Sequence, residues 1–251
     1  MFDVVIFRAR PVILTIGFMG ILLSNASGAP NTLTVRDPRP VAKAIVELDK
    51  RYGWQITYED LPLSHSSDMP HVTPLVQENG SLAPGGAVPE GSLSFALPSA
   101  GQDQASVVEA LVKTYNASGG GNEFAVVHGA RLLHVVPRKV RGLSGTVKPV
   151  LDTVITVEPK ERTAMQLLDE ICEKVSIGAN TDVFVGTVPI NRLYQTKTSI
   201  GGSRQTARSM LEQLILELGT PGAPVTWRLL YGSENKSYAI NIYFVDALKY
   251  Q

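Results

Sequence analysis

Only one cysteine, Cys172, occurs among the 251 residues. A chain with a single thiol cannot form an internal disulfide bond, so its stability has to come from the burial of apolar side chains. Apolar residues make up 44% of the sequence, which is enough for a hydrophobic core in a chain of this length. Cys172 itself falls among the apolar positions of an expected helix, and we predict a small core residue there instead of a nucleophile.

Excess charge of either sign is also missing. Lys and Arg total 23, Asp and Glu total 23, and the formal net charge is zero. Binding to nucleic acid relies on a clustered cationic surface, and binding to a membrane surface relies on a dense run of basic residues. The sequence has neither feature, so we expect no nucleic-acid partner and no membrane-surface patch.

The apolar run from Val12 to Leu23 is shorter than the roughly 20 residues that a membrane-spanning helix needs. Arg8 and Arg10 precede this run, and the small residues NASGAP follow it. This order is typical of a secretory signal peptide, which we place at residues 1–29. We therefore predict a periplasmic or secreted protein with no integral membrane segment after cleavage. The alternative is that the run remains in the protein as a membrane anchor.

Sequence motifs of catalysis are missing as well. The string GLSGT from Gly142 comes nearest to the Gly-x-Ser-x-Gly motif of serine hydrolases but fails at its last position. The glycines Gly119–Gly121 follow an expected helix, whereas a phosphate-binding loop precedes one, and no Gly-Lys-Ser/Thr completes the motif. We predict no catalytic residue, no cofactor-binding residue and no enzyme activity.

Four histidines are present, and two of them, His65 and His71, flank Asp68 in a Pro/Ser-rich segment. These residue types are metal ligands, but a metal site needs ligands that converge on a rigid framework. We predict no metal site. His128 and His134 stand on either side of an expected turn, and we place both at the surface or at the rim of the sheet.

A group of carboxylates, Asp169, Glu170 and Glu173, lies beside Lys174. Their spacing along an expected helix is that of a solvated face with mixed charges. We therefore do not interpret them as an acid/base pair for catalysis.

The first half of the chain alternates strands and helices. TLTVRD is an expected strand, a helix follows from about Pro40 to Tyr52, Gly53 ends that helix, and WQITYED is the next strand. Residues 61–91 contain five prolines and four glycines, which predicts a long exposed loop. SLSFALP is another strand, a helix runs from about Gln104 to Asn116, and EFAVVHG and RLLHVVP form a hairpin.

The second half repeats this order after an expected linker. TVITVEP is a strand, residues 161–175 form a helix, and DVFVGTVP is a strand followed by a short loop, INRLY. QTKTSIGG leads to a helix from about Arg204 to Leu218, and VTWRLLYG and YAINIYFV form a final hairpin. The prediction is an α+β chain of two tandem β-α-β-β-α-β-β modules, each with two helices packed against small sheets. We place the first at residues 30–138, the linker at 139–152 and the second at 153–251.

Three segments carry a resemblance to a known family: VRDPRPVAKAIVELDKRYGWQITYED, ITVEPKERTAMQLLDEICEKV and SVVEALVKTYNASGGGNEFAVVHGARLLHVVP. Each half resembles the secretin and TonB short N-terminal domain family. The resemblance implies a periplasmic module of two helices between two small sheets, which makes protein contacts that assemble rings or relay a signal. The chain departs from the usual hosts of that domain because no barrel-forming sequence follows the second copy, and because the loop at 61–91 is longer.

These features together predict an exported, non-enzymatic protein-interaction module that docks to an envelope protein. Edge strands of its sheets could accept a partner strand. The aromatic residues Trp227, Tyr231, Tyr238 and Tyr243 are possible partner contacts, although core packing explains them almost as well. The alternatives are a secreted hydrolase acting on the cell wall, and a small-ligand or wall-binding protein that uses the long loop as a lid.

Overall fold

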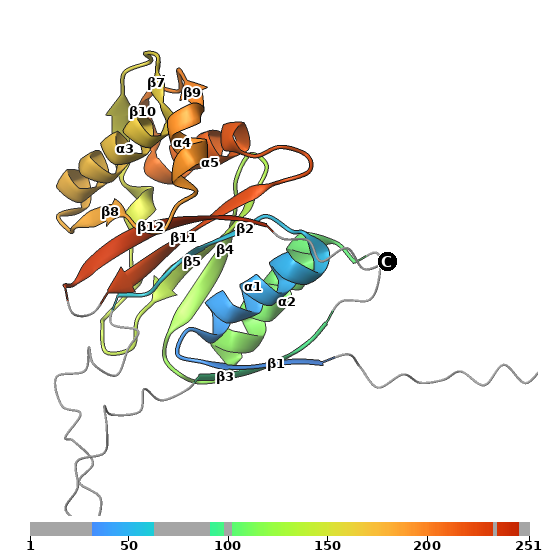
Figure 1. Cartoon of the computed structure of the whole chain (residues 1–251). Helices are drawn as coiled ribbons and strands as arrows, with labels where there is room; N and C mark the ends of the chain where they lie inside the picture. The colour runs from blue at the N-terminus through green and yellow to red at the C-terminus, as the bar shows by residue number, and fades with distance from the viewer. Residues whose placement is uncertain (1–31, 63–90, 98–101, 233–234, 246–251) are drawn as a thin grey trace, which may run out of the picture. The chain divides into compact units, whose positions relative to one another are not determined.

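The computed structural model describes residues 32–62, 91–97, 102–232 and 235–245 (Figure 1). The predicted signal peptide lies outside the described residues. So does almost all of the predicted loop, including His65, Asp68 and His71. The described residues belong to one compact unit.

The first half, up to residue 139, contains two helices and five strands among the described residues. In chain order they are β1 (Thr32–Asp37), α1 (Pro40–Tyr52), β2 (Ile56–Glu59), β3 (Gly91–Ala96), α2 (Gln104–Ala117), β4 (Glu123–His128) and β5 (Leu133–Lys139). Strands β1 and β3 form an antiparallel ribbon on one side of α1 and α2, and the larger sheet lies on the other side (Figure 1). A hydrophobic core that includes Ile45, Leu48, Tyr58, Leu111 and Val135 fills the space between them.

The second half contains more short elements than the sequence predicts. In chain order they are η2 (Val150–Asp152), β6 (Val154–Val157), β7 (Arg162–Thr163), α3 (Ala164–Ala179), β8 (Val183–Val185), α4 (Ile190–Gln195), β9 (Lys197–Thr198), β10 (Gly202–Thr206), α5 (Ala207–Leu218), β11 (Val225–Gly232) and β12 (Ser237–Phe244). The prediction of a loop at INRLY is wrong, because these residues begin the helix α4. Leu193 of this helix is buried in the second core, which explains why the segment folds back as a helical turn.

One six-stranded sheet joins the two halves, with the strand order β4-β5-β2-β11-β12-β8. Strand β2 of the first half pairs in parallel with β11 of the second half, with Tyr58 opposite Arg228 and Glu59 opposite Leu229. The α+β class is confirmed. The division into two tandem modules separated at residues 139–152 stays a prediction, since the halves share this sheet.

The helices of the two halves cover opposite faces of the shared sheet (Figure 1). Successive side chains of a strand alternate between the faces, and neighbouring residues of paired strands share a face. Tyr58 therefore faces the core beneath α1 and α2, whereas Glu59 and its neighbour Leu229 face α5. As a result β2 is buried on both faces, although it contains the polar residues Thr57 and Glu59.

Local signals set the helix ends. Pro40 occupies the first turn of α1, and Gly53 ends the helix in the left-handed region with φ of 67°. Thr163 and Gln166 form a capping box at the start of α3, with each side chain accepting a hydrogen bond from the other residue's backbone N–H. Asp103 caps α2 in the same position, where its carboxylate accepts the Ser106 N–H.

Candidate functional site

The four predicted contact aromatics lie mostly inside the protein. Trp227, Tyr231 and Tyr238 are buried in the core of the second half. Tyr243 is only half-buried, and the guanidinium of Arg228 lies 4.7 Å above its ring. The side chains of the first three thus serve core packing in this structure, which is the alternative that the sequence left open.

The surface position predicted for His134 is wrong, because its side chain is only 1% exposed. Helix α5 of the second half covers this face of β5, a contact that the hairpin sequence alone does not reveal. The His134 Nδ1 atom lies 2.7 Å from Thr57 Oγ1, and its Nε2 atom lies 3.4 Å from Glu212 Oε2. Burial and the nearby Arg208 lower the pKa of His134 to about 4, although Glu212 acts in the opposite direction. The imidazole is therefore neutral near pH 7.

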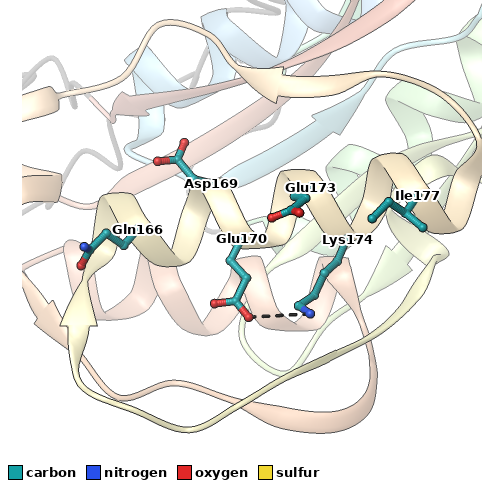
Figure 2. Close-up of a pocket in the computed structure, with 6 residues that line it drawn as sticks. All are labelled: Gln166, Asp169, Glu170, Glu173, Lys174 and Ile177. Atoms are coloured by element: carbon teal, nitrogen blue, oxygen red, sulfur yellow. Dashed lines mark ion pairs between the residues drawn. The ribbon is translucent and has the colours of Figure 1, made fainter.

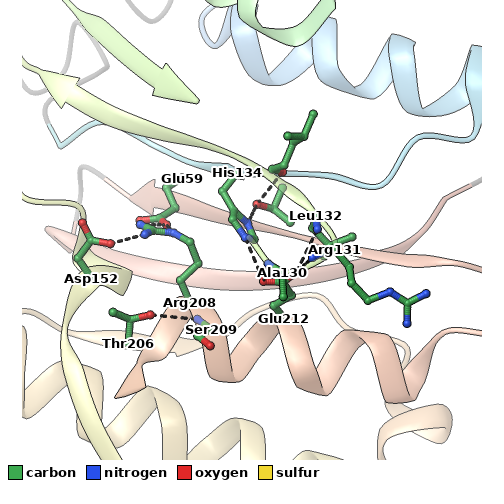
Figure 3. Close-up of polar contacts among 12 residues, drawn as sticks. Glu59, Ala130, Arg131, Leu132, His134, Asp152, Thr206, Arg208, Ser209 and Glu212 are labelled. Carbon is green, nitrogen blue, oxygen red and sulfur yellow. Dashed lines mark hydrogen bonds and ion pairs between the residues drawn. The ribbon is translucent and has the colours of Figure 1, made fainter. Parts of the chain in front are cut away.

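Glu212 of α5 binds the turn between β4 and β5 (Figure 3). Its carboxylate accepts hydrogen bonds from three consecutive backbone N–H groups, those of Ala130 at 3.1 Å, Arg131 at 2.6 Å and Leu132 at 3.0 Å. Hydrogen bonds to a charged acceptor are stronger than those between neutral groups. A single side chain of the second half thus fixes the turn of a hairpin in the first half.

Arg208, one helical turn before Glu212, extends toward Glu59 of β2 (Figure 3). Its Nε atom donates to Glu59 Oε1 at 2.8 Å, and its guanidinium also contacts Asp152. Burial raises the pKa of Glu59, whereas the positive charge of Arg208 opposes that increase. The Leu151 N–H donates to the second Glu59 oxygen at 3.4 Å, so the carboxylate has partners on both oxygens.

Two further ion pairs lie along the junction of β2 and β11. Arg228 donates to Asp49 of α1 at 2.7 Å, and Arg39 donates to Asp60 at 2.5 Å. Burial raises the pKa of Asp49 to about 7 against the attraction of Arg228. The carboxylates of Asp49 and Asp60 are buried, whereas Arg39 and Arg228 are partly exposed. Arg39 and Asp60 also bind the backbone of Tyr231, so both ion pairs contribute to the contact between the two halves.

A shallow hollow on α3 is lined by residues of that helix alone: Gln166, Asp169, Glu170, Glu173, Lys174 and Ile177 (Figure 2). The Lys174 Nζ atom lies 3.7 Å from Glu170 Oε1 in a surface ion pair. Asp169 and Glu173 are exposed, as predicted for a solvated helix face. Cys172, in the apolar core beneath the helix, is buried as predicted, and burial raises the pKa of its thiol to about 12.

Strands β4 and β8 are the two outer strands of the six-stranded sheet. On β4, the Asn116 side chain accepts the Phe124 N–H and donates to the Phe124 carbonyl, both at 2.9 Å. Main-chain groups of alternate residues point to the same side of a strand. Val126 and His128 therefore direct their N–H and C=O groups outward like Phe124, and no described strand pairs with them there.

On β8, the hydroxyl of Ser176 likewise binds the outward main-chain groups of one residue, Val183. It accepts the Val183 N–H at 2.9 Å and lies 3.1 Å from the Val183 carbonyl. Val185 comes two residues later and points its main-chain groups in the same outward direction. Each outer strand is therefore covered by a helix side chain near its start and, within the described residues, is uncovered further along.

No group of three His, Cys, Asp or Glu side chains in the described part of the chain is arranged to hold a metal ion. Within the same residues, no helix combines the length and the apolar character that crossing a bilayer requires. The chain matches no protein-family model, no curated protein and no solved structure. The resemblance to the secretin and TonB short N-terminal domain family therefore stays a prediction.

Proposed function

We propose that the chain is an exported, non-enzymatic protein-interaction module of the bacterial envelope, which docks a partner strand on the outer edge of β4. The observation that supports this proposal is the set of outward main-chain groups at Val126 and His128. Such groups on an edge strand bind an extended partner by adding it to the sheet. The location in the envelope rests on the predicted signal peptide at residues 1–29.

The equivalent strand of the second half already accepts a strand in this way. Val126 lies opposite Val135 in the first hairpin, and Leu229 lies opposite Ile240 in the second. On the predicted equivalence of the two halves, Val126 corresponds to Leu229, because each packs against the core of its own half. The Leu229 carbonyl accepts the Asp60 N–H at 2.8 Å. Strand β11 therefore receives β2 at the position where β4 is uncovered by the described residues.

The surroundings of β4 favour recognition by main-chain pairing over deep side-chain pockets. Val127 is partly exposed, and the His128 Nε2 atom forms an exposed hydrogen bond with Glu109 Oε1 of α2 at 3.1 Å. An exposed pair of this kind contributes at most about 1 kcal/mol, so a partner can displace it at little cost. Sheet extension supplies the affinity, and the flanking side chains supply the selectivity.

The test is site-specific photo-crosslinking in bacterial cells that produce the full chain. A crosslinking amino acid at Val127 is expected to capture an envelope protein, and the substitution His128→Pro is expected to abolish that product by removing an outward N–H. Ser144→Pro, in an exposed irregular segment, is the matched control and leaves capture intact. Equal capture by the wild-type chain and by His128→Pro would refute docking at β4.

A further inference from the structure

The junction inside the chain joins two unlike edges. The β2 edge of the first half meets the β11 edge of the second half. The equivalents of these edges are β8 and β4, because β8 pairs in parallel with β12 as β2 does with β5, and β4 begins the hairpin as β11 does. The two outer strands of the sheet, β8 and β4, are thus the same two kinds of edge that meet in the internal contact. A head-to-tail contact of this kind can be repeated between two molecules.

We propose that the partner is a second copy of this chain, whose β4 edge and α2 dock on the β8 edge and on the sheet face around Phe184. This inference rests on the proposed function, because it names the strand that β4 receives. The six-stranded sheet would then continue from one copy into the next through a contact between β8 and β4 of the same kind as the internal contact between β2 and β11.

The exposure of Phe184 is the first observation that supports a second copy. In the first half Thr57 lies opposite His134, and in the second half Phe184 lies opposite Ala239. Phe184 is therefore the counterpart of Thr57, which is fully buried beneath α5. Phe184 is 49% exposed, so an aromatic ring stands open at the place that the internal junction covers.

The outer edges carry no charge at the positions that correspond to the Glu59–Arg208 ion pair. Arg208 and Ala105 are both the second residue of their helices, α5 and α2. By the strand registers Gly186 is the counterpart of Glu59. The buried ion pair of the internal junction is thus replaced by two uncharged residues, one on each outer edge, and docking of a second copy would bury no unpaired charge there.

A second ion pair of the junction is replaced in the same way. Asp49 precedes Ile56 by seven residues, as Ser176 precedes Val183, and the backbone of Ile56 acts to lower the pKa of Asp49. Ser176 is therefore the counterpart of Asp49. Arg228, the partner of Asp49, corresponds to Ala125 by the hairpin registers. Because the Asp49 side chain lies at the same position beside β2, which is paired with β11, we expect that Ser176 does not block pairing at β8.

The charge at the hairpin turn points to the same partner. Glu109 and Glu212 are both the sixth residue of their helices, and Glu212 binds the turn at Arg131. The turn of the second hairpin carries Lys236, which is exposed. Glu109, with a side chain 55% exposed, would meet the turn that carries Lys236 in the second copy. Opposite charges at these positions favour docking.

Sedimentation analysis of the purified full chain tests this proposal over a range of concentrations. We expect concentration-dependent association that Phe184→Lys weakens by about tenfold through loss of apolar burial. Phe244→Lys is the matched control, because Phe244 is 44% exposed and lies on the other face of the sheet by strand alternation. The control is expected to associate like the wild-type chain.

Charge reversal gives a second readout that does not depend on the apolar contact. Glu109→Lys and Lys236→Glu are each expected to weaken association by about fivefold, and the chain with both substitutions is expected to recover it. A chain that stays monomeric up to about 1 mM, or association that none of these substitutions changes, would overturn the second-copy proposal. If β4 still captures another envelope protein in that case, only the identity of the partner fails, and docking at β4 stands.

Discussion

Glu59 of β2 and Arg208 of α5 are 149 residues apart in the sequence and form a buried ion pair with an Nη2–Oε1 distance of 2.6 Å. Each residue comes from a different half of the chain. Removing two charges from water costs several kcal/mol, and this cost is offset only when other polar groups complete the pairing. Asp152 and the Leu151 N–H complete it here. The pair therefore selects the arrangement of the halves more than it adds net stability.

Removal of one partner of this pair is expected to be strongly destabilising. Arg208→Ala leaves Glu59 buried without its charge partner, and we expect a loss of about 3–5 kcal/mol in the free energy of unfolding, measured by urea denaturation. The double variant Arg208→Met/Glu59→Met fills the same space with apolar atoms and is expected to recover most of that loss. A double variant as unstable as Arg208→Ala alone would show that the charges themselves hold the junction.

Local features of the fold could be predicted from the sequence because their causes are local. The helix at Pro40–Tyr52 has its proline at the start, its glycine at the end and apolar residues at helical spacing between them. The burial of Cys172 followed from its place in such a spacing. The α+β class followed from the order of these elements.

The junction could not be predicted, because its contacts join residues far apart in the sequence. The burial of Thr57 and Glu59 on a strand with one polar face depends on α5, which covers that face from the other half. A polar face of a strand ordinarily indicates solvent, and the surface position predicted for His134 was wrong for the same reason. The remaining signal was the two adjacent carboxylates Glu59 and Asp60 at the end of β2, in the string ITYED, and only a paired partner makes such charges stable inside a protein.

Gly129 tests how tightly the hairpin turn is held against α5. A Cβ atom at this position would lie 2.3 Å from His134 Nε2 and 2.4 Å from Glu212 Oε2, well inside contact distance. We expect Gly129→Ala to lower the free energy of unfolding by about 1–3 kcal/mol, measured by chemical denaturation. Gly120→Ala is the matched control, since no atom lies within 4 Å of the added methyl group, and it is expected to stay within about 0.5 kcal/mol of the wild-type chain. Equal effects of the two substitutions would contradict the close packing of the turn.

The pKa of His134 predicts how the stability of the junction depends on pH. Burial lowers this pKa from 6.5 to about 4 in the folded chain, so between these values the unfolded chain binds a proton that the folded chain does not. The contribution of His134 to stability is therefore lost as the pH falls from 6.5 to 4.

Asp49 acts in the opposite direction over nearly the same range, because burial raises its pKa from 3.8 to about 7. The folded chain then binds the extra proton, and the contribution of Asp49 favours folding as the pH falls. The two effects oppose each other in the wild-type chain, so the measurement has to compare it with His134→Gln, which keeps Asp49 and removes the imidazole. We expect the stability of this variant relative to the wild-type chain to increase from pH 7.5 to pH 4.5 in urea titrations, and a constant difference would contradict a buried neutral His134.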